Sequence, residues 1–116
     1  MDDRGLTSIE RLKHIAEAIS NIEKFCKDVE EQKFLDDEQI SSSVLYQFIV
    51  IGEAIRFVDP AILKKYPYTW HLPRSFRNYV AHEYFGVNLK QVYKTVKHIL
   101  PEFKEIIQNI IESEDI

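Results

Sequence analysis

The apolar residues of this chain recur at steps of three and four along most of its length, and this period constrains the fold more than any other feature. One such stripe consists of Ile9, Leu12, Ala16, Ile19, Ile22 and Cys26. Another consists of Val44, Leu45, Phe48, Ile51, Ile55 and Val58, and a third runs from Leu89 to Ile110. Residues with this spacing lie on one face of an α-helix and form one side of a hydrophobic core. With only three glycines and no β-hairpin signal, the chain is predicted to form an all-α bundle.

The predicted bundle has four long helices and one short helix. We expect the long helices at about 7–29, 38–58, 73–85 and from 88 onward, and the short helix at about 60–66. Polar residues suited to capping helix N-termini stand before three of the long helices: Thr7, Asp36 or Asp37, and Asn88. Their side-chain oxygens can accept hydrogen bonds from the first free backbone N–H groups.

The breaks between the helices follow from residues that interrupt helical geometry. Gly86 is expected to end the 73–85 helix in a left-handed conformation. Pro101 lies inside the last apolar stripe and is expected to kink or divide that helix near Leu100. Residues 30–37 are mostly charged, so we expect a polar connector there, with Phe34 and Leu35 tucked beneath it.

Length and composition exclude several classes of protein. At 116 residues the chain is predicted to be a single domain covering 1–116. No apolar run approaches the length of a membrane span, and the first residues lack the pattern of a secretory signal. Cys26 is the only cysteine, so no disulfide framework is possible and a cytoplasmic location is expected. The net charge of −4 argues against a protein that coats nucleic acid.

The charge is unevenly distributed along the chain. Residues 60–82 contain no Asp or Glu. Four residues of this segment are candidates for RNA contact, namely Lys64, Lys65, Trp70 and Arg74, because single-stranded RNA needs cations for its phosphates and rings for its bases. The alternative is that the rings belong to the core and the lysines are simply solvated.

The stretch 77–84, Arg-Asn-Tyr-Val-Ala-His-Glu-Tyr, contains the side chains of this sequence that are best suited to catalysis. Arg77 is suited to binding phosphate oxygens, and His82 can accept or donate a proton near neutral pH. Together they can activate a ribose 2′-hydroxyl and stabilise charge on the attacked phosphate. Asn78 adds a neutral donor, and Tyr84 is expected in the last helical turn, at an exposed helix end.

The helical spacing sets a limit on this site. Five residues separate Arg77 from His82, which is about 140° around the axis and roughly 7.5 Å along it. The two groups therefore need a further wall, from a neighbouring helix or a second copy of the chain. A plainer interpretation is also open, in which Arg77 pairs with a carboxylate, His82 is an interfacial histidine and Tyr84 is packing.

One earlier helix offers a partner for this stretch. Gly52 within the predicted 38–58 helix carries a helix-propensity cost, which indicates close approach of another helix there, although a tolerated accident is possible. Glu53 beside it is expected to face a helix interface and to pair with an arginine.

The chain resembles a known family in several segments. The spacing of Arg77, His82 and Tyr84 resembles the Arg-x4-His-x-Tyr motif of HepT-type HEPN toxins. The segments that resemble the family elsewhere are Ile51-Gly52-Glu53-Ala54, Lys65-Tyr66-Pro67 with Trp70, Tyr84-Phe85-Gly86-Val87 and Leu100-Pro101-Glu102. These matches occur in consistent order over nearly the whole chain.

The resemblance implies a HEPN-like up-and-down helical bundle and an endoribonuclease toxin that acts as a homodimer on tRNA or mRNA. It implies catalysis by Arg77 and His82 without metal or other cofactor, and it makes Glu53 a candidate supporting residue rather than a catalyst. The expected partner is a minimal nucleotidyltransferase (MNT) antitoxin, which would attach AMP to Tyr84. The alternative is a catalytically silent helical module that binds and positions a nucleotidyltransferase.

Overall fold

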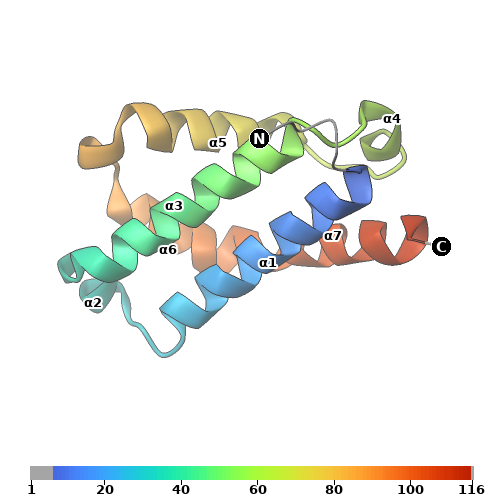
Figure 1. Cartoon of the computed structure of the whole chain (residues 1–116). Coiled ribbons are helices and arrows are strands. Elements are labelled where there is room, and N and C mark those ends of the chain that lie inside the picture. Colours follow the sequence, from blue (N-terminus) through green and yellow to red (C-terminus); the bar gives the residue numbers. More distant parts are fainter. Residues whose placement is uncertain (1–6, 116) are drawn as a thin grey trace.

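The computed structural model describes residues 7–115, which form a bundle of helices running alternately in opposite directions (Figure 1). The long helices are α1 (Ser8–Cys26), α3 (Glu38–Ile55), α5 (His71–His82) and a continuous helix made of α6 (Leu89–Lys94), the π-helical η3 (Thr95–Ile99) and α7 (Leu100–Glu114). The connections contain α2 (Glu31–Asp36), α4 (Pro60–Leu63) and a 3₁₀ turn, η2 (Tyr84–Gly86). The predicted all-α bundle with four long helices is confirmed, and none of residues 7–115 forms a strand.

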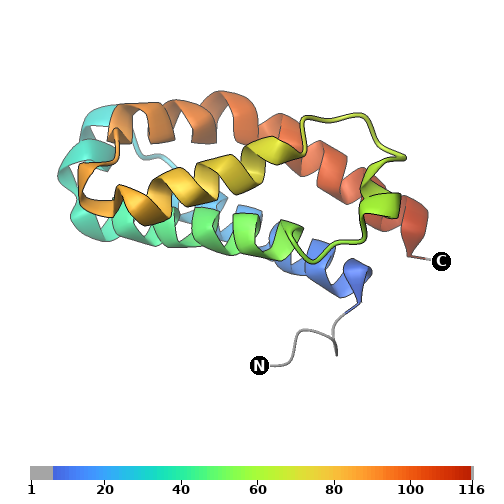
Figure 2. The ribbon, with the colours of Figure 1, turned by 90° about the horizontal axis from the view of Figure 1, so that it is seen from above.

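The core lies mainly between α1, α3 and α7. Helix α1 packs against both α3 and α7, whereas α5 packs mainly against α3. Seen from above, α5 lies between α3 and the α6–α7 helix (Figure 2). Fully buried aliphatic side chains are supplied by each of the three central helices, including Leu12, Ile15, Ile19, Ile22, Val44, Ile107 and Ile110. Within residues 7–115, no helix combines the length and the apolar character needed to cross a membrane.

Three predicted caps begin the long helices. The side chain of Thr7 accepts a hydrogen bond from the Glu10 N–H at 3.1 Å. Asp37 accepts from Ile40 at 3.2 Å, and Asn88 accepts from the backbone N–H three residues ahead, also at 3.2 Å. These bonds satisfy backbone donors that have no partner inside the helix.

The connector at residues 30–37 differs from its prediction. It forms the short helix α2 rather than an irregular loop. Asp28 ends the preceding helix with a positive φ of 58°, a conformation that Asp adopts more readily than most residues. Phe34, as predicted, is fully buried, and its ring lies 5.5 Å from that of Tyr93. The burial of this one side chain explains why a short, charged segment adopts an ordered helical turn.

The last long helix is divided near Leu100, as Pro101 predicts. Proline has no N–H to donate to the carbonyl four residues earlier. The preceding residues respond by widening into a π-helix, in which the Leu100 N–H donates to the Thr95 carbonyl. Regular α-helix resumes at Leu100.

The end of α5 corrects two predictions. The helix ends at His82 rather than 85, and Tyr84 lies in the following 3₁₀ turn. No glycine in the described part of the chain has a positive φ, so Gly86 is not a left-handed cap. The chain turns instead through a tertiary contact, because the Asn88 N–H donates to the Tyr79 hydroxyl at 2.9 Å.

The segment between α4 and α5 is attached to the last helix. The predicted short helix at 60–66 is confined to Pro60–Leu63, followed by turns. The Tyr66 hydroxyl donates to Glu114 at 2.7 Å, and Lys65 forms an ion pair with the same carboxylate at 3.3 Å. These contacts, the Tyr66 hydrogen bond first, hold the pKa of Glu114 below its ordinary value. The loop that leads into α5 is thereby tied to the C-terminal end of α7.

Candidate functional site

The site is built where α5 crosses α3. At the crossing, Gly52 faces Arg77 so closely that a Cβ atom on residue 52 would collide with the Cβ of Arg77 and lie 2.8 Å from the Pro73 carbonyl oxygen. Only glycine therefore allows this approach without a shift of the helices. The expected close approach at Gly52 is confirmed.

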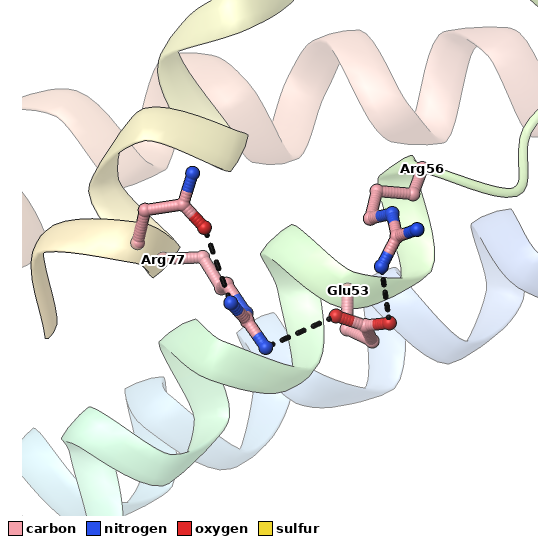
Figure 3. Close-up of polar contacts among 4 residues, drawn as sticks. Glu53, Arg56 and Arg77 are labelled. Atoms are coloured by element: carbon pink, nitrogen blue, oxygen red, sulfur yellow. Dashed lines mark hydrogen bonds and ion pairs between the residues drawn. The ribbon is translucent and has the colours of Figure 1, made fainter. Parts of the chain in front are cut away.

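The close approach places Arg77 beside Glu53, the next residue of α3. Arg77 Nη2 lies 3.3 Å from Glu53 Oε2, and Nη1 donates to Asn78 Oδ1 at 3.1 Å. The other oxygen of Glu53 accepts from Arg56 Nη1 at 3.1 Å. Figure 3 shows the Glu53 carboxylate between the two guanidinium groups. The expected pairing of Glu53 with an arginine is therefore present.

The cluster of Glu53, Arg56 and Arg77 has an excess of positive charge. One carboxylate serves two arginines, Arg56 and Arg77, so the three groups together carry one net positive charge. The contact between Arg77 and Glu53 lies within ion-pair distance, but Oε2 lacks an aligned hydrogen bond. Arg77 Nε is also buried without a hydrogen-bond partner in the described part of the chain. The Arg77 side chain is 32% exposed, so the accessible part of its guanidinium can bind an anion.

His82 is the last residue of α5 and is exposed. Within residues 7–115, no hydrogen bond or ion pair engages its imidazole. The helix carries Arg77 toward α3 while turning His82 away by about 140°. Arg77, Asn78 and Glu53 thus come together in one protomer, and His82 stays apart from them. No group of three or more His, Cys, Asp or Glu side chains positioned to hold a metal ion occurs in this same range.

The turn after His82 presents two aromatic residues. Tyr84 is half-buried, and its ring lies 5.5 Å from that of Phe85 in an edge-to-face arrangement. The hydroxyl of Tyr84 has no partner among the described residues. Phe85 is 99% exposed, which is unusual for a large apolar side chain and marks this end of α5 as a candidate contact surface.

The candidate RNA contacts lie mostly at the opposite end of α5. Arg74 is exposed on α5 itself, whereas Lys64 and Lys65 precede the helix. Lys65 is engaged with Glu114. Trp70 is half-buried, and its Nε1 donates to the carbonyl oxygens of Leu63 and Tyr66 at 3.1 and 2.9 Å. The Trp70 indole is therefore occupied by structural contacts.

One member of the cluster, Arg56, was not predicted from the sequence. Its position three residues after Glu53 was a usable signal, since such pairs lie side by side on a helix. The guanidinium of Arg56 also lies 5.3 Å from the centroid of the Phe57 ring. Because Arg56 also contacts Glu53, it competes with Arg77 for this carboxylate.

Known proteins resemble this chain over most of its length. The sequence model of the family described as "Ribonuclease HepT-like" matches residues 15–110. A Methanocaldococcus jannaschii protein named "Putative RNase" is 33% identical over 102 residues, which cover 84% of this chain and 82% of that protein. A Thermococcus cleftensis protein named "Probable ribonuclease HepT" is 33% identical over 94 residues, covering 80% and 86%. No solved structure matches the chain significantly.

The helix crossing yields a stability prediction. We expect Gly52→Ala to lower the free energy of unfolding by about 1–3 kcal/mol, because the added methyl group meets the Cβ of Arg77 and the helices must separate. Gly86→Ala is the matched control, since a Cβ there meets only Glu83 Oε2 at 3.7 Å. Urea unfolding of the two variants and the wild type measures the difference. Equal stability of both variants would contradict this account of the crossing.

Proposed function

Because the chain belongs to the HepT-like ribonuclease family, we propose that it is a metal-independent endoribonuclease whose site is centred on Arg77 and His82. The observation that carries the proposal is their arrangement on α5. Arg77 is held at the α3 crossing in a cluster with an excess of positive charge. His82 is exposed and has no hydrogen-bond or ion-pair partner among residues 7–115. One group suits a phosphate and the other suits a proton transfer.

The proposed reaction is an internal attack within the RNA strand. The ribose 2′-oxygen bonds to the adjacent phosphorus while the bond from phosphorus to the 5′-oxygen breaks. His82 accepts the 2′ proton or supplies the proton that the leaving 5′-oxygen needs. Arg77 binds the phosphate oxygens as their charge increases in the transition state. The products are a 2′,3′-cyclic phosphate and a 5′-hydroxyl end.

We propose that the complete site forms in a homodimer. Within one protomer Arg77 and His82 lie on different flanks of α5, so a second copy is needed to bring both to one phosphate. The nearly complete exposure of Phe85 beside this end of α5 supports a protein contact there, because aromatic residues anchor interfaces. A two-fold axis near α5 would create two equivalent composite sites.

We further propose that an MNT-type nucleotidyltransferase antitoxin neutralises the enzyme by modifying Tyr84. In the proposed step, the Tyr84 hydroxyl oxygen attacks the α-phosphorus of ATP, and pyrophosphate leaves. The unpartnered hydroxyl and its position two residues after His82 support this role. An attached AMP would place bulk and negative charge beside the imidazole and obstruct RNA.

The central test is RNA cleavage by purified protein in EDTA. Intact mass is measured first to verify that Tyr84 carries no AMP. Wild type is expected to cleave tRNA or mRNA, and His82→Ala is expected to lower the rate by about 10²- to 10⁴-fold, because general acid–base catalysis contributes that much. A preparation of unmodified wild type that cleaves neither RNA would favour a silent module that binds a nucleotidyltransferase. Equal cleavage by both proteins would indicate a contaminant or a different site.

The composite site predicts complementation between two inactive variants. Arg77→Ala and His82→Ala subunits are co-expressed with different tags, and the mixed dimer is isolated. If each site combines Arg77 of one subunit with His82 of the other, the mixed dimer retains one intact site and about half of the wild-type activity. Each homodimeric variant serves as a control. An inactive mixed dimer would place the whole site within one protomer.

The Tyr84 assignment predicts selective modification. Incubation with the nucleotidyltransferase partner and ATP is expected to add the mass of one AMP to wild type and to abolish its RNA cleavage. Tyr84→Phe is expected to gain no mass. Tyr46→Phe is the matched control, because Tyr46 is 61% exposed on α3 and lies outside the motif. Continued modification of Tyr84→Phe would exclude Tyr84 as the acceptor.

A further inference from the structure

An apolar cleft of about 420 Å³ opens between α5 and the α6–η3 helix. Its walls are mainly aromatic and aliphatic, and they include Phe48, Phe76, Tyr79, Ile99 and Phe103. Several lining residues remain accessible at the mouth, with Leu72 47% and Ile99 48% exposed. A cleft of this size and character suits a small planar group better than a protein helix.

The cleft also contains a few polar groups. Ser75 on α5 and Gln91 on α6 line it with exposed side chains that form no hydrogen bond within residues 7–115. The Thr95 hydroxyl donates to the Gln91 carbonyl at 2.9 Å and keeps its acceptor capacity. Aromatic faces with a few free donors and acceptors are the combination that binds a nucleobase by stacking and by contacts to its polar edge.

The cleft is adjacent to the catalytic flank of α5. Ser75, Tyr79 and His82 follow one another at steps of four and three residues, so they lie on one stripe of the helix. Part of the cleft lining, at Ser75 and Tyr79, therefore lies on the His82 side of α5. Phe48 and Ile51 of α3 also line the cleft. The Tyr79 end of the cleft lies one helical turn from His82, so a base bound at this end places its phosphate on the same side of α5 as the imidazole.

The α6 helix, which forms one side of the cleft, carries two exposed lysines. Residues 84–101 contain no Asp or Glu, although the chain as a whole has a net charge of −4. Lys90 and Lys94 stand at consecutive turns of α6, both exposed and without an ion pair in the described part of the chain. On the helix surface Lys94 neighbours Gln91, which lines the cleft. Apolar walls beside unpaired cations complement a base beside its phosphates.

We propose that this cleft binds an unpaired base of the RNA strand next to the scissile phosphate, with the flanking phosphates on Lys90 and Lys94. The proposal rests on the proposed ribonuclease function and adds a base-recognition site to it. The occupant is single-stranded RNA, because a paired base cannot leave its stack to enter a cleft without added cost. Cleavage would accordingly be directed to loops and unpaired ends.

The chain supplies its own reporter for occupancy of the cleft. Trp70 is the only tryptophan. Its ring centroid lies 5.0 Å from that of Tyr68 and 6.4 Å from that of Phe103, and both of these rings line the cleft. A base that enters should therefore change the Trp70 fluorescence, whereas phosphate contacts at Lys90 and Lys94 alone should not.

The test measures binding of a short single-stranded RNA to His82→Ala protein, because this substitution slows turnover under the proposed mechanism. Ser75→Phe and Thr95→Phe each place a ring in the cleft. Ser20→Phe, at an exposed position of α1, is the matched control. We expect either cleft variant to weaken binding about tenfold, the magnitude typical of losing a stacked base. An abasic strand of equal length should bind all variants alike and leave Trp70 fluorescence unchanged.

The outcomes separate this inference from the proposed function. If Ser75→Phe and Thr95→Phe bind RNA as tightly as Ser20→Phe, the base site is wrong even when wild type cleaves RNA. If wild type fails to cleave but binding depends on the base and the cleft, the ribonuclease proposal fails and the base site stands. Circular dichroism verifies that each variant is folded. A cleft variant that changes the oligomeric state without changing RNA affinity would assign the cleft to a second copy and overturn the inference.

Discussion

The packing of α5 on α3 at Gly52 is the contact on which the rest of the site depends. A glycine in the middle of a helix lowers helix stability by about 1 kcal/mol relative to alanine, and here it permits a contact that a larger residue excludes. The approach places Arg77 against Glu53 and thereby sets the orientation of all the remaining side chains of α5. With Arg77 against α3, the helical period requires Ser75, Tyr79 and His82 to face away from it.

Glu53 has a structural and an electrostatic role. It holds Arg77 at the crossing, yet it also accepts from Arg56, so neither guanidinium is neutralised by a carboxylate of its own. A fully paired arginine would have less capacity for a phosphate, and an unpaired one would be poorly positioned. The shared carboxylate provides position while leaving net positive charge, which suits the proposed role of Arg77 in transition-state binding.

Helix α5 carries different functional groups on its two flanks. One flank packs on α3 and carries Arg77, and the opposite flank carries His82 and borders the apolar cleft. Beyond His82, the Phe85 side chain is almost fully exposed. Because Arg77 and His82 lie on separate flanks of α5, the proposed catalytic site is suited to completion by a second molecule. The proposed dimer contact and antitoxin would meet α5 near its C-terminal end, and the proposed RNA strand would run along its cleft side.

The sequence alone determined the all-α bundle, the caps at Thr7 and Asn88 and a further cap at Asp36 or Asp37, and the motif from Arg77 to Tyr84, because helical period and capping are local properties. The structure selected Asp37. Even Gly52 and Glu53 could be linked to a helix contact from local cost and charge. Tertiary structure decided what depends on residues distant in sequence. Burial of Phe34 beside Tyr93, which lies far along the chain, converted a polar connector into a helix. Nearer in sequence, the Asn88 N–H donates to the Tyr79 hydroxyl where a glycine cap was expected. The cleft likewise exists only because α5 and α6–η3 lie side by side, a relation that no local pattern encodes.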